Sequence, residues 1–253
     1  MSCDLLVFGA HPDDAELAFG GLLASCVDRG LTVVVVDATR GERGTRGDAE
    51  TRARESLEAA RRLGVTERLQ LGLPDLGLEA GDTLQRRKVI TTIRERRPRL
   101  VLGPHPEEGH PDHAALAGIL RAAVEEARFE GSLAAGATHV VVQLFHAWPA
   151  AGADQGGGAG GGGGWGGGAI ADISETFERK RQALAAYASQ FEGDGPATRL
   201  ASGDFLQLVE ARARVAGAAL GVRYGEGLCW RGAASLAALS LLALAPTHGK
   251  GPA

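Results

Sequence analysis

The sequence predicts an α/β fold in which helices cover both faces of a mostly parallel sheet. Short apolar runs alternate with stretches of helical period over the first half of the chain, and this alternation is typical of parallel sheets. Two of the runs, 5–9 and 100–103, are too short for helices and are predicted to be buried strands. We therefore expect a Rossmann-like arrangement with the active site at the C-terminal edge of the strands, where open sheets bind ligands.

The other elements of the first half follow from period and punctuation. Gly30 and Gly64 stand where helices should end, and Pro98 stops a third helix. The expected order is strand 5–9, a helix ending before Gly30, strand 32–36, helix 48–63, strand 69–73, helix 82–97, strand 100–103, helix 113–128 and strand 139–145.

The second half is less regular. Residues 150–168 are nearly all glycine and alanine, which predicts a flexible surface loop without a catalytic role. A short strand at 169–173 is expected next, then a helix from an N-cap at Ser174 to about Phe191, and a last helix over 205–220. No element is assigned from Val222 onward.

Composition limits the class of protein. The chain has 253 residues, of which 44% are hydrophobic, so residues 1–253 are expected to form one domain with the glycine-rich loop inside it. A formal charge of −4 argues against nucleic-acid binding and favours a small-molecule substrate. The three scattered cysteines and the missing leader predict a cytoplasmic protein. The apolar stretch 233–246 is shorter than a membrane span, so it should be a docking helix or strand.

Two clusters of metal-binding side chains follow the two apolar strands. The first is His11-Pro12-Asp13-Asp14, and the second is His110-Pro111-Asp112-His113. If the strands are parallel neighbours, both clusters lie at one edge and can share one metal ion. Catalytic zinc sites take three ligands from histidine and carboxylate, so His11 and Asp14 would supply two, and either His110 or His113 the third. Each cluster alone could also be a helix-capping turn.

The two motifs resemble the signature of the PIG-L/LmbE-type zinc-dependent N-acetylglucosamine deacetylases. The likeness is closest to the branch that deacetylates N-acetylglucosaminyl-malate in bacillithiol biosynthesis. It extends to further stretches of the chain: Thr39-Arg40-Gly41-Glu42, Arg52, Leu73-Pro74-Asp75-Leu76-Gly77-Leu78, Ala186-Tyr187-Ala188-Ser189-Gln190-Phe191 and Gly221-Val222-Arg223-Tyr224-Gly225-Glu226-Gly227.

The resemblance implies roles for the residues of both clusters. His11, Asp14 and His113 would bind zinc, and Asp13 would be the general base, which its position beside a ligand makes physically reasonable. His110, oriented by Asp112, would stabilise the oxyanion and protonate the leaving amine. Ferrous iron accepts the same ligand set.

Three further residues match substrate positions of the family. Arg52 would bind a malate carboxylate and Asp75 sugar hydroxyls, while Tyr187 matches a tyrosine that assists at the oxyanion. Each also has a structural interpretation, as a surface arginine, a turn aspartate and a half-buried core tyrosine. The chain departs from its relatives at Phe145-His146-Ala147-Trp148-Pro149, where they carry an Asn-Gly strand end, and this alters one wall of the pocket.

Several alternatives stay open at this point. The substrate could be another N-acetylglucosamine compound, such as a mycothiol-type precursor or a chitobiose-like sugar. A nucleotide-binding domain without hydrolysis would use Asp37 as its ribose-binding acid, although the first turn lacks the G-x-G-x-x-G phosphate cradle. His105 and His146 are expected to be exposed or packed, and relatives of this kind suggest a homo-oligomer.

Overall fold

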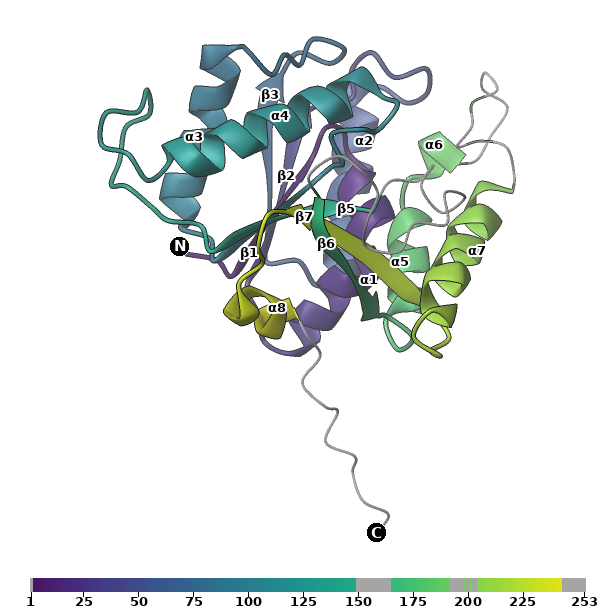
Figure 1. Cartoon of the computed structure of the whole chain (residues 1–253). Coiled ribbons are helices and arrows are strands. Elements are labelled where there is room, and N and C mark those ends of the chain that lie inside the picture. The colour runs from purple at the N-terminus through teal and green to yellow at the C-terminus, as the bar shows by residue number, and fades with distance from the viewer. Residues whose placement is uncertain (1, 149–164, 192–197, 199–200, 202–203, 243–253) are drawn as a thin grey trace.

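The computed structural model describes residues 2–148, 165–191, 198, 201 and 204–242 (Figure 1). Its helices and strands are β1 Leu5–Gly9, α1 Asp14–Asp28, β2 Val33–Thr39, α2 Ala49–Leu63, β3 Glu67–Leu73, α3 Thr83–Arg96, β4 Leu100–Gly103, α4 Pro111–Glu126, β5 Gln143–Ala147, β6 Trp165–Asp172, α5 Phe177–Leu184, α6 Ala188–Phe191, α7 Phe205–Ala218, β7 Gly225–Arg231 and α8 Leu236–Leu242.

The described strands form one seven-stranded sheet in the order β3-β2-β1-β4-β5-β7-β6. The strands from β1 to β5 are parallel, whereas β7 pairs antiparallel with both β5 and β6. The predicted α/β fold with a mostly parallel sheet is therefore confirmed.

Alternating side chains of the central strand supply two cores, one on each face of the sheet. Leu5 and Val7 belong to the apolar cluster that packs under α1 and α2, while Leu6 and Phe8 belong to the cluster under α3 and α4. All four side chains are at most 1% exposed. The two helical layers lie on opposite faces of the sheet, as Figure 1 shows. Burial on both faces explains why this strand is continuously apolar.

The strand order places a topological switch point at β1. Its neighbours are β2 on one side and β4 on the other, so the chain connections leave in opposite directions there. Leu5 pairs with Leu100 and Val7 with Leu102, which keeps β1 and β4 in step. Residues that follow Gly9 and Gly103 therefore emerge at the same edge, where sheets of this type bind ligands.

Two predicted elements in the second half are corrected by the structure. The β-branched run at 139–142 leads into the sheet, and β5 begins only at Gln143. The helix expected from Ser174 to Phe191 is divided into α5 and α6, and its N-cap residue is Thr176. The Ser174 hydroxyl instead accepts the Tyr224 N–H at 3.2 Å, which anchors the chain to β7.

The glycine-rich stretch is partly outside the described residues. Strand β6 begins at Trp165, so residues 165–168 pair with β7, earlier than the sequence indicated. Gly168 suits this position because a Cβ there would lie 2.5 Å from the Trp148 ring. Residues 149–164 lie outside the described part, and the predicted flexible loop is not tested there.

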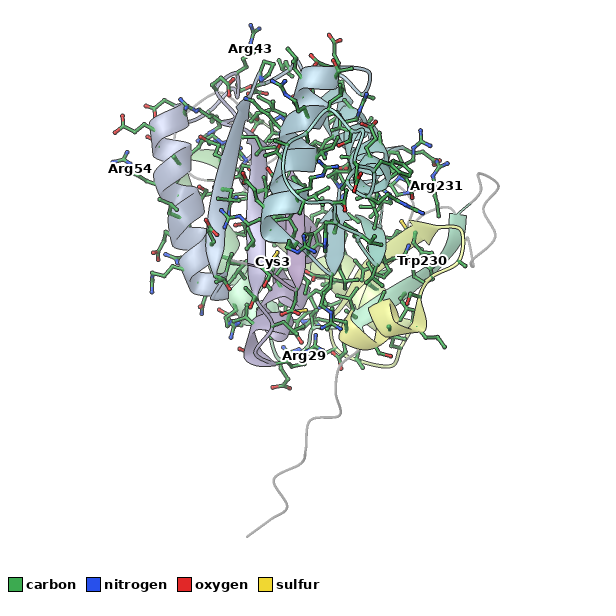
Figure 2. The ribbon with its side chains drawn as sticks, turned by 90° about the vertical axis from the view of Figure 1, so that its left-hand side faces the viewer. Cys3, Arg29, Arg43, Arg54, Trp230 and Arg231 are labelled. Atoms are coloured by element: carbon green, nitrogen blue, oxygen red, sulfur yellow. The ribbon has the colours of Figure 1, made fainter. Side chains whose placement is uncertain are left out.

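Charged side chains cover the outer surface. Figure 2 shows Arg43 and Arg54 projecting outward at the periphery of the molecule. Cys3, by contrast, is buried at 4% exposure. No helix in the described part of the chain is long and apolar enough to cross a bilayer.

Candidate metal-dependent active site

The turn after β1 folds the first cluster onto itself. Asp13 adopts φ 110° and ψ −25°, a backbone conformation that is uncommon outside glycine. The His11 N–H donates to Asp14 Oδ2 at 2.9 Å, and the Asp14 N–H donates to the His11 carbonyl at 3.3 Å. Gly9 permits this approach, because a Cβ there would lie 3.0 Å from the Asp14 Cβ. Such strain costs about 1–3 kcal/mol and is concentrated at functional sites.

The second cluster begins helix α4. His110 is the N-cap residue, and its Nδ1 accepts the Asp112 N–H at 3.3 Å. Pro111 occupies the first helical position, which its fixed φ favours. Capping therefore accounts for one nitrogen of His110. It does not account for His113, whose ring turns toward the first cluster.

Three side chains of the two clusters meet at one carboxylate oxygen. His113 Nε2 lies 3.2 Å from Asp14 Oδ2, and His11 Nδ1 lies 3.6 Å from the same oxygen. The rings of His11 and His113 have centroids 5.4 Å apart. The two distant motifs thus come together at the edge of the sheet, with one ring nitrogen of each histidine directed at Asp14.

This donor set fits a divalent metal ion. One nitrogen from each of His11, His110 and His113 lies within 4.8 Å of the others, and Asp14 adds a carboxylate oxygen. Two imidazoles and a carboxylate are the ligands of many catalytic zinc sites, which leave a position for water. Ligation by His11, Asp14 and His113 leaves His110 free for another role.

Asp13 is buried next to this group and held by an arginine. Its side chain is 5% exposed, and Arg52 Nη2 lies 3.2 Å from its Oδ2. Burial raises the pKa of Asp13 to about 7, although Arg52 opposes this shift. A carboxyl group that titrates near neutral pH is suited to general base catalysis.

The same contact directs Arg52 into the protein. Its Nη2 donates to the Pro12 carbonyl at 2.6 Å and its Nη1 to the Gly41 carbonyl at 3.3 Å. The side chain is 5% exposed, so its guanidinium is engaged by Asp13 and by backbone oxygens. The family resemblance implied that this fork binds a substrate carboxylate. The placement instead supports a role in holding Asp13 and its strained turn.

The Asp112 carboxylate contacts the His11 ring, and no hydrogen bond joins it to the His110 ring in the described part of the chain. Its Oδ2 lies 3.2 Å from His11 Nε2 and accepts the Leu76 N–H at 2.8 Å. Asp75 Oδ1 also lies 3.2 Å from His11 Nε2. Two carboxylates predicted to serve His110 and the substrate therefore face the same nitrogen of a candidate metal ligand.

His110 keeps a donor available at the site. Because its Nδ1 accepts a backbone N–H, the neutral ring carries its proton on Nε2. Burial, together with the neighbouring His11 and His113, lowers the pKa of His110, so the ring is neutral at pH 7. A neutral imidazole with an Nε2 proton can stabilise an oxyanion by donating a hydrogen bond.

Tyr187 lies in the core rather than at the surface of the site. It is 0% exposed and belongs to the apolar cluster under α1. Its hydroxyl has no hydrogen-bond partner among the described residues, and burial raises its pKa well above the usual value. The core position, which was the structural interpretation of this residue, describes the side chain, and its role at the oxyanion stays a prediction.

A buried cluster of charged side chains lies under the site and was not predicted from the sequence. Arg68 on β3 binds Asp37 on β2 with two hydrogen bonds of 2.7 Å and contacts Glu16 on α1. Glu16 is 0% exposed, so an acid inside the apolar stripe of the first helix was the signal that could have revealed it. Because Asp37 is buried and paired with Arg68, it is not available to a ribose, and the nucleotide-binding alternative loses its acid.

His105 and His146 pack beside the site. Both are buried, at 3% and 4% exposure, and His146 Nδ1 lies 2.8 Å from the Pro104 carbonyl. His105 Nδ1 accepts the Glu107 N–H at 3.1 Å. Packing, one of the two expected placements, describes both.

Comparison with known proteins agrees with this geometry. The family model "PIG-L: GlcNAc-PI de-N-acetylase" matches residues 6–124, which contain both clusters. A diacetylchitobiose deacetylase of Thermococcus kodakarensis is 32% identical over 203 residues, or 75% of this chain and 71% of the relative. The chain belongs to the PIG-L deacetylase family. It is therefore an N-deacetylase of N-acetylglucosamine-containing compounds, with a candidate metal site of histidine and aspartate.

Two further proteins are similar to this chain over most of its length. A probable N-acetyl-alpha-D-glucosaminyl L-malate deacetylase 2 of Bacillus cereus is 28% identical over 205 residues, covering 76% of this chain and 86% of the relative. The crystal structure of TT1542 from Thermus thermophilus has a TM-score of 0.78 at 34% identity and covers 92% of this chain and 96% of that protein. The names of the Thermococcus and Bacillus relatives give different substrates, so membership does not decide which conjugate this deacetylase uses.

Zinc binding to this PIG-L family site is expected to release protons. In the metal-free site, burial would lower the pKa values of His11 and His113, but Asp14 raises them to about 9 and about 11. Both rings are thus protonated at pH 7, and a metal must displace one proton from each. We expect release of close to two protons per zinc and an affinity that rises with pH between about 7 and 9.

Calorimetry in buffers of different ionisation heat measures this release. A binding heat that is independent of the buffer would contradict the expectation.

The raised pKa values of the two histidines also predict how the stability of the metal-free protein depends on pH. Because the folded pKa values exceed the unfolded value of about 6.5, this stabilisation is complete below that pH. It is lost as pH rises through about 9 for His11 and about 11 for His113. Thermal melts of the chelated protein check this direction.

Proposed function

We propose that the protein is a zinc-dependent hydrolase that removes the N-acetyl group from an N-acetylglucosaminyl conjugate with an anionic partner group, with N-acetylglucosaminyl L-malate of bacillithiol biosynthesis as the first candidate. The meeting of His11, His113 and Asp14 at one oxygen carries the hydrolase assignment. The first ligand shell would be these three residues. A bound zinc ion would polarise the acetyl carbonyl and activate water as a nucleophile.

The residues around this group can perform the remaining steps. Asp13, beside Asp14, would accept the proton of the attacking water, so that a new C–O bond forms at the acetyl carbon. His110 would donate its Nε2 hydrogen to the developing oxyanion. When the C–N bond breaks, the amine of the sugar would take the proton that Asp13 accepted from water, and acetate leaves. Arg52 would keep Asp13 in place through its contact of 3.2 Å.

Charge at the edge of the site favours an anionic conjugate. Residues 40–47, which follow β2, carry exposed arginines at positions 40 and 43. The Arg43 N–H donates to Asp75 Oδ2 at 2.7 Å, and Asp75 in turn faces His11. The Glu42 carboxylate is occupied by backbone N–H groups of Arg40 and Asp75. The exposed guanidinium groups of Arg40 and Arg43 are therefore the candidate contacts for the carboxylates of malate at the rim of the site.

A panel of substrates tests this proposal. Release of free amine would be measured with the malate conjugate, diacetylchitobiose and an N-acetylglucosaminyl-inositol. We expect the malate conjugate to have the highest kcat/KM. The second candidate is a chitobiose-type sugar, which the 32% identity to the Thermococcus enzyme favours. A preference for diacetylchitobiose would replace the first choice, and no activity on any of the three would overturn the substrate class.

Replacing Arg43 by glutamine should separate the candidates further. We expect kcat/KM for the malate conjugate to fall about tenfold, because one charge-assisted contact is worth about 1.5 kcal/mol, while activity on neutral chitobiose stays unchanged. Arg54→Gln, an exposed arginine on the outer surface of α2, is the matched control. An equal loss on both substrates would show that Arg43 does not distinguish the anionic conjugate from the neutral sugar.

Two further expectations belong to this proposal. Ferrous iron accepts the same ligands as zinc, so elemental analysis of protein purified without added metal should identify the ion.

We also expect a cytoplasmic homo-oligomer, and light scattering coupled to size-exclusion chromatography measures its assembly state.

A further inference from the structure

The two ring nitrogens of His11 have different surroundings. Nδ1 faces Asp14 at 3.6 Å, on the side where the candidate metal ligands meet. Nε2 points the opposite way and lies 3.2 Å from both Asp75 Oδ1 and Asp112 Oδ2. The side chains of the two carboxylates are only 4% and 2% exposed, so water does not screen these contacts.

Both carboxylates are fixed by backbone groups of neighbouring loops. The Asp112 oxygens accept the N–H groups of Leu76 at 2.8 Å and Leu78 at 3.2 Å. The second oxygen of Asp75 accepts the Arg43 N–H at 2.7 Å. The loops after β2 and β3 and the start of α4 therefore converge on one imidazole nitrogen.

We propose that Asp75 and Asp112 are positioning residues that hold the Nε2 proton of His11 and thereby present its Nδ1 to the metal ion. The inference rests on the metal centre of the proposed function and adds two residues that contact its ligand His11. A carboxylate that accepts the second N–H of a metal-bound histidine fixes its tautomer and orientation and raises its basicity. This assigns to Asp75 and Asp112 a task other than contact with the sugar or with His110.

A second metal ion held by His11 Nε2, Asp75 and Asp112 is the competing interpretation, because these three groups also lie within 4.8 Å of one another. Three of the four carboxylate oxygens already accept backbone N–H groups. An imidazole that binds metals through both nitrogens must also lose its second ring proton. One zinc ion per chain is therefore expected.

The other histidine provides an internal comparison. His113 Nε2 faces Asp14, and its Nδ1 lies 3.2 Å from Glu108 Oε2. The Glu108 side chain is 31% exposed, so its support should be weaker than that of the buried pair. Substitution of Glu108 should thus affect metal binding less than substitution of Asp112.

The test is the zinc dissociation constant of the full chain, measured without substrate by competition with a fluorescent chelator. The variants are Asp112→Asn, Asp75→Asn, the double variant and Glu108→Gln. An asparagine amide can donate to Nε2 and so favours the wrong tautomer. Glu226→Gln is the matched control, since Glu226 is buried and accepts the N–H groups of Gly21 and Leu22 far along α1. Circular dichroism confirms folding of each variant.

We expect Asp112→Asn and Asp75→Asn each to weaken zinc binding about 10- to 100-fold, with a larger loss in the double variant, a smaller one in Glu108→Gln and none in Glu226→Gln. Either single variant suffices if the other does not fold. Folded variants that bind zinc within twofold of the wild type would overturn the positioning role of Asp75 and Asp112 and leave the deacetylase proposal intact. Two zinc ions per wild-type chain would also overturn it. A wild type that binds no zinc would overturn both.

Discussion

Replacing Asp13 by asparagine is expected to lower kcat by about 10²- to 10⁴-fold while zinc stays bound, because general base catalysis contributes about that much. Asp13 lies next to the candidate ligand Asp14, and Arg52 holds its Oδ2 at 3.2 Å. Its pKa, raised by burial to about 7, lets the group accept a proton near neutral pH and pass it on. Asparagine keeps the shape of the side chain but loses this capacity, together with the negative charge that faces Arg52.

The measurement is the release of free amine under saturating substrate, with zinc content determined on the same sample. Asp48→Asn is the control variant: Asp48 is an N-cap residue of α2 that accepts the Thr51 N–H at 2.7 Å, and asparagine caps helices equally well. Near wild-type turnover in the Asp13 variant, with full metal content, would show that another group removes the proton.

The position of the site could be predicted from the sequence because it depends on topology. Two apolar strands, each followed by histidine and aspartate, need only be parallel neighbours for their clusters to meet. The pairing of Leu5 with Leu100 provides this, and both strands end at the same edge. The helix ends at Gly64 and before Pro98 were equally local, since a glycine at φ 76° and a proline act through their own backbone.

The directions of individual side chains could not be predicted in this way. Residue type and spacing do not say which partner a carboxylate contacts. The resemblance paired Asp112 with His110, and the structure places its Oδ2 3.2 Å from His11 Nε2. Arg52 was expected to face the substrate because it matches a substrate position of the family. Its position is buried, at 4% exposure, and a buried guanidinium turns to the acceptors available there. Tertiary contacts decide these orientations.

Removing the metal should have the other large effect. We expect a chelated sample to lose activity about 10³-fold or more and to regain it with zinc, because polarising a carbonyl is worth several kcal/mol. Without a cation, His11 and His113 face Asp14 at 3.6 Å and 3.2 Å, and these charges compensate one another. Without the metal ion, the acetyl carbonyl is not polarised, and Asp13 and His110 alone are not expected to support the reaction.

Addition of different ions to the chelated protein tests whether the ligand set determines this dependence. Zinc and ferrous iron should restore turnover, since both accept two imidazoles and a carboxylate. Magnesium should not, because it prefers oxygen ligands in an octahedral arrangement. Full activity in a sample shown by elemental analysis to contain no transition metal would mean that the meeting of His11, Asp14 and His113 is a structural ion cluster. The site would then need a different source of electrophilic assistance.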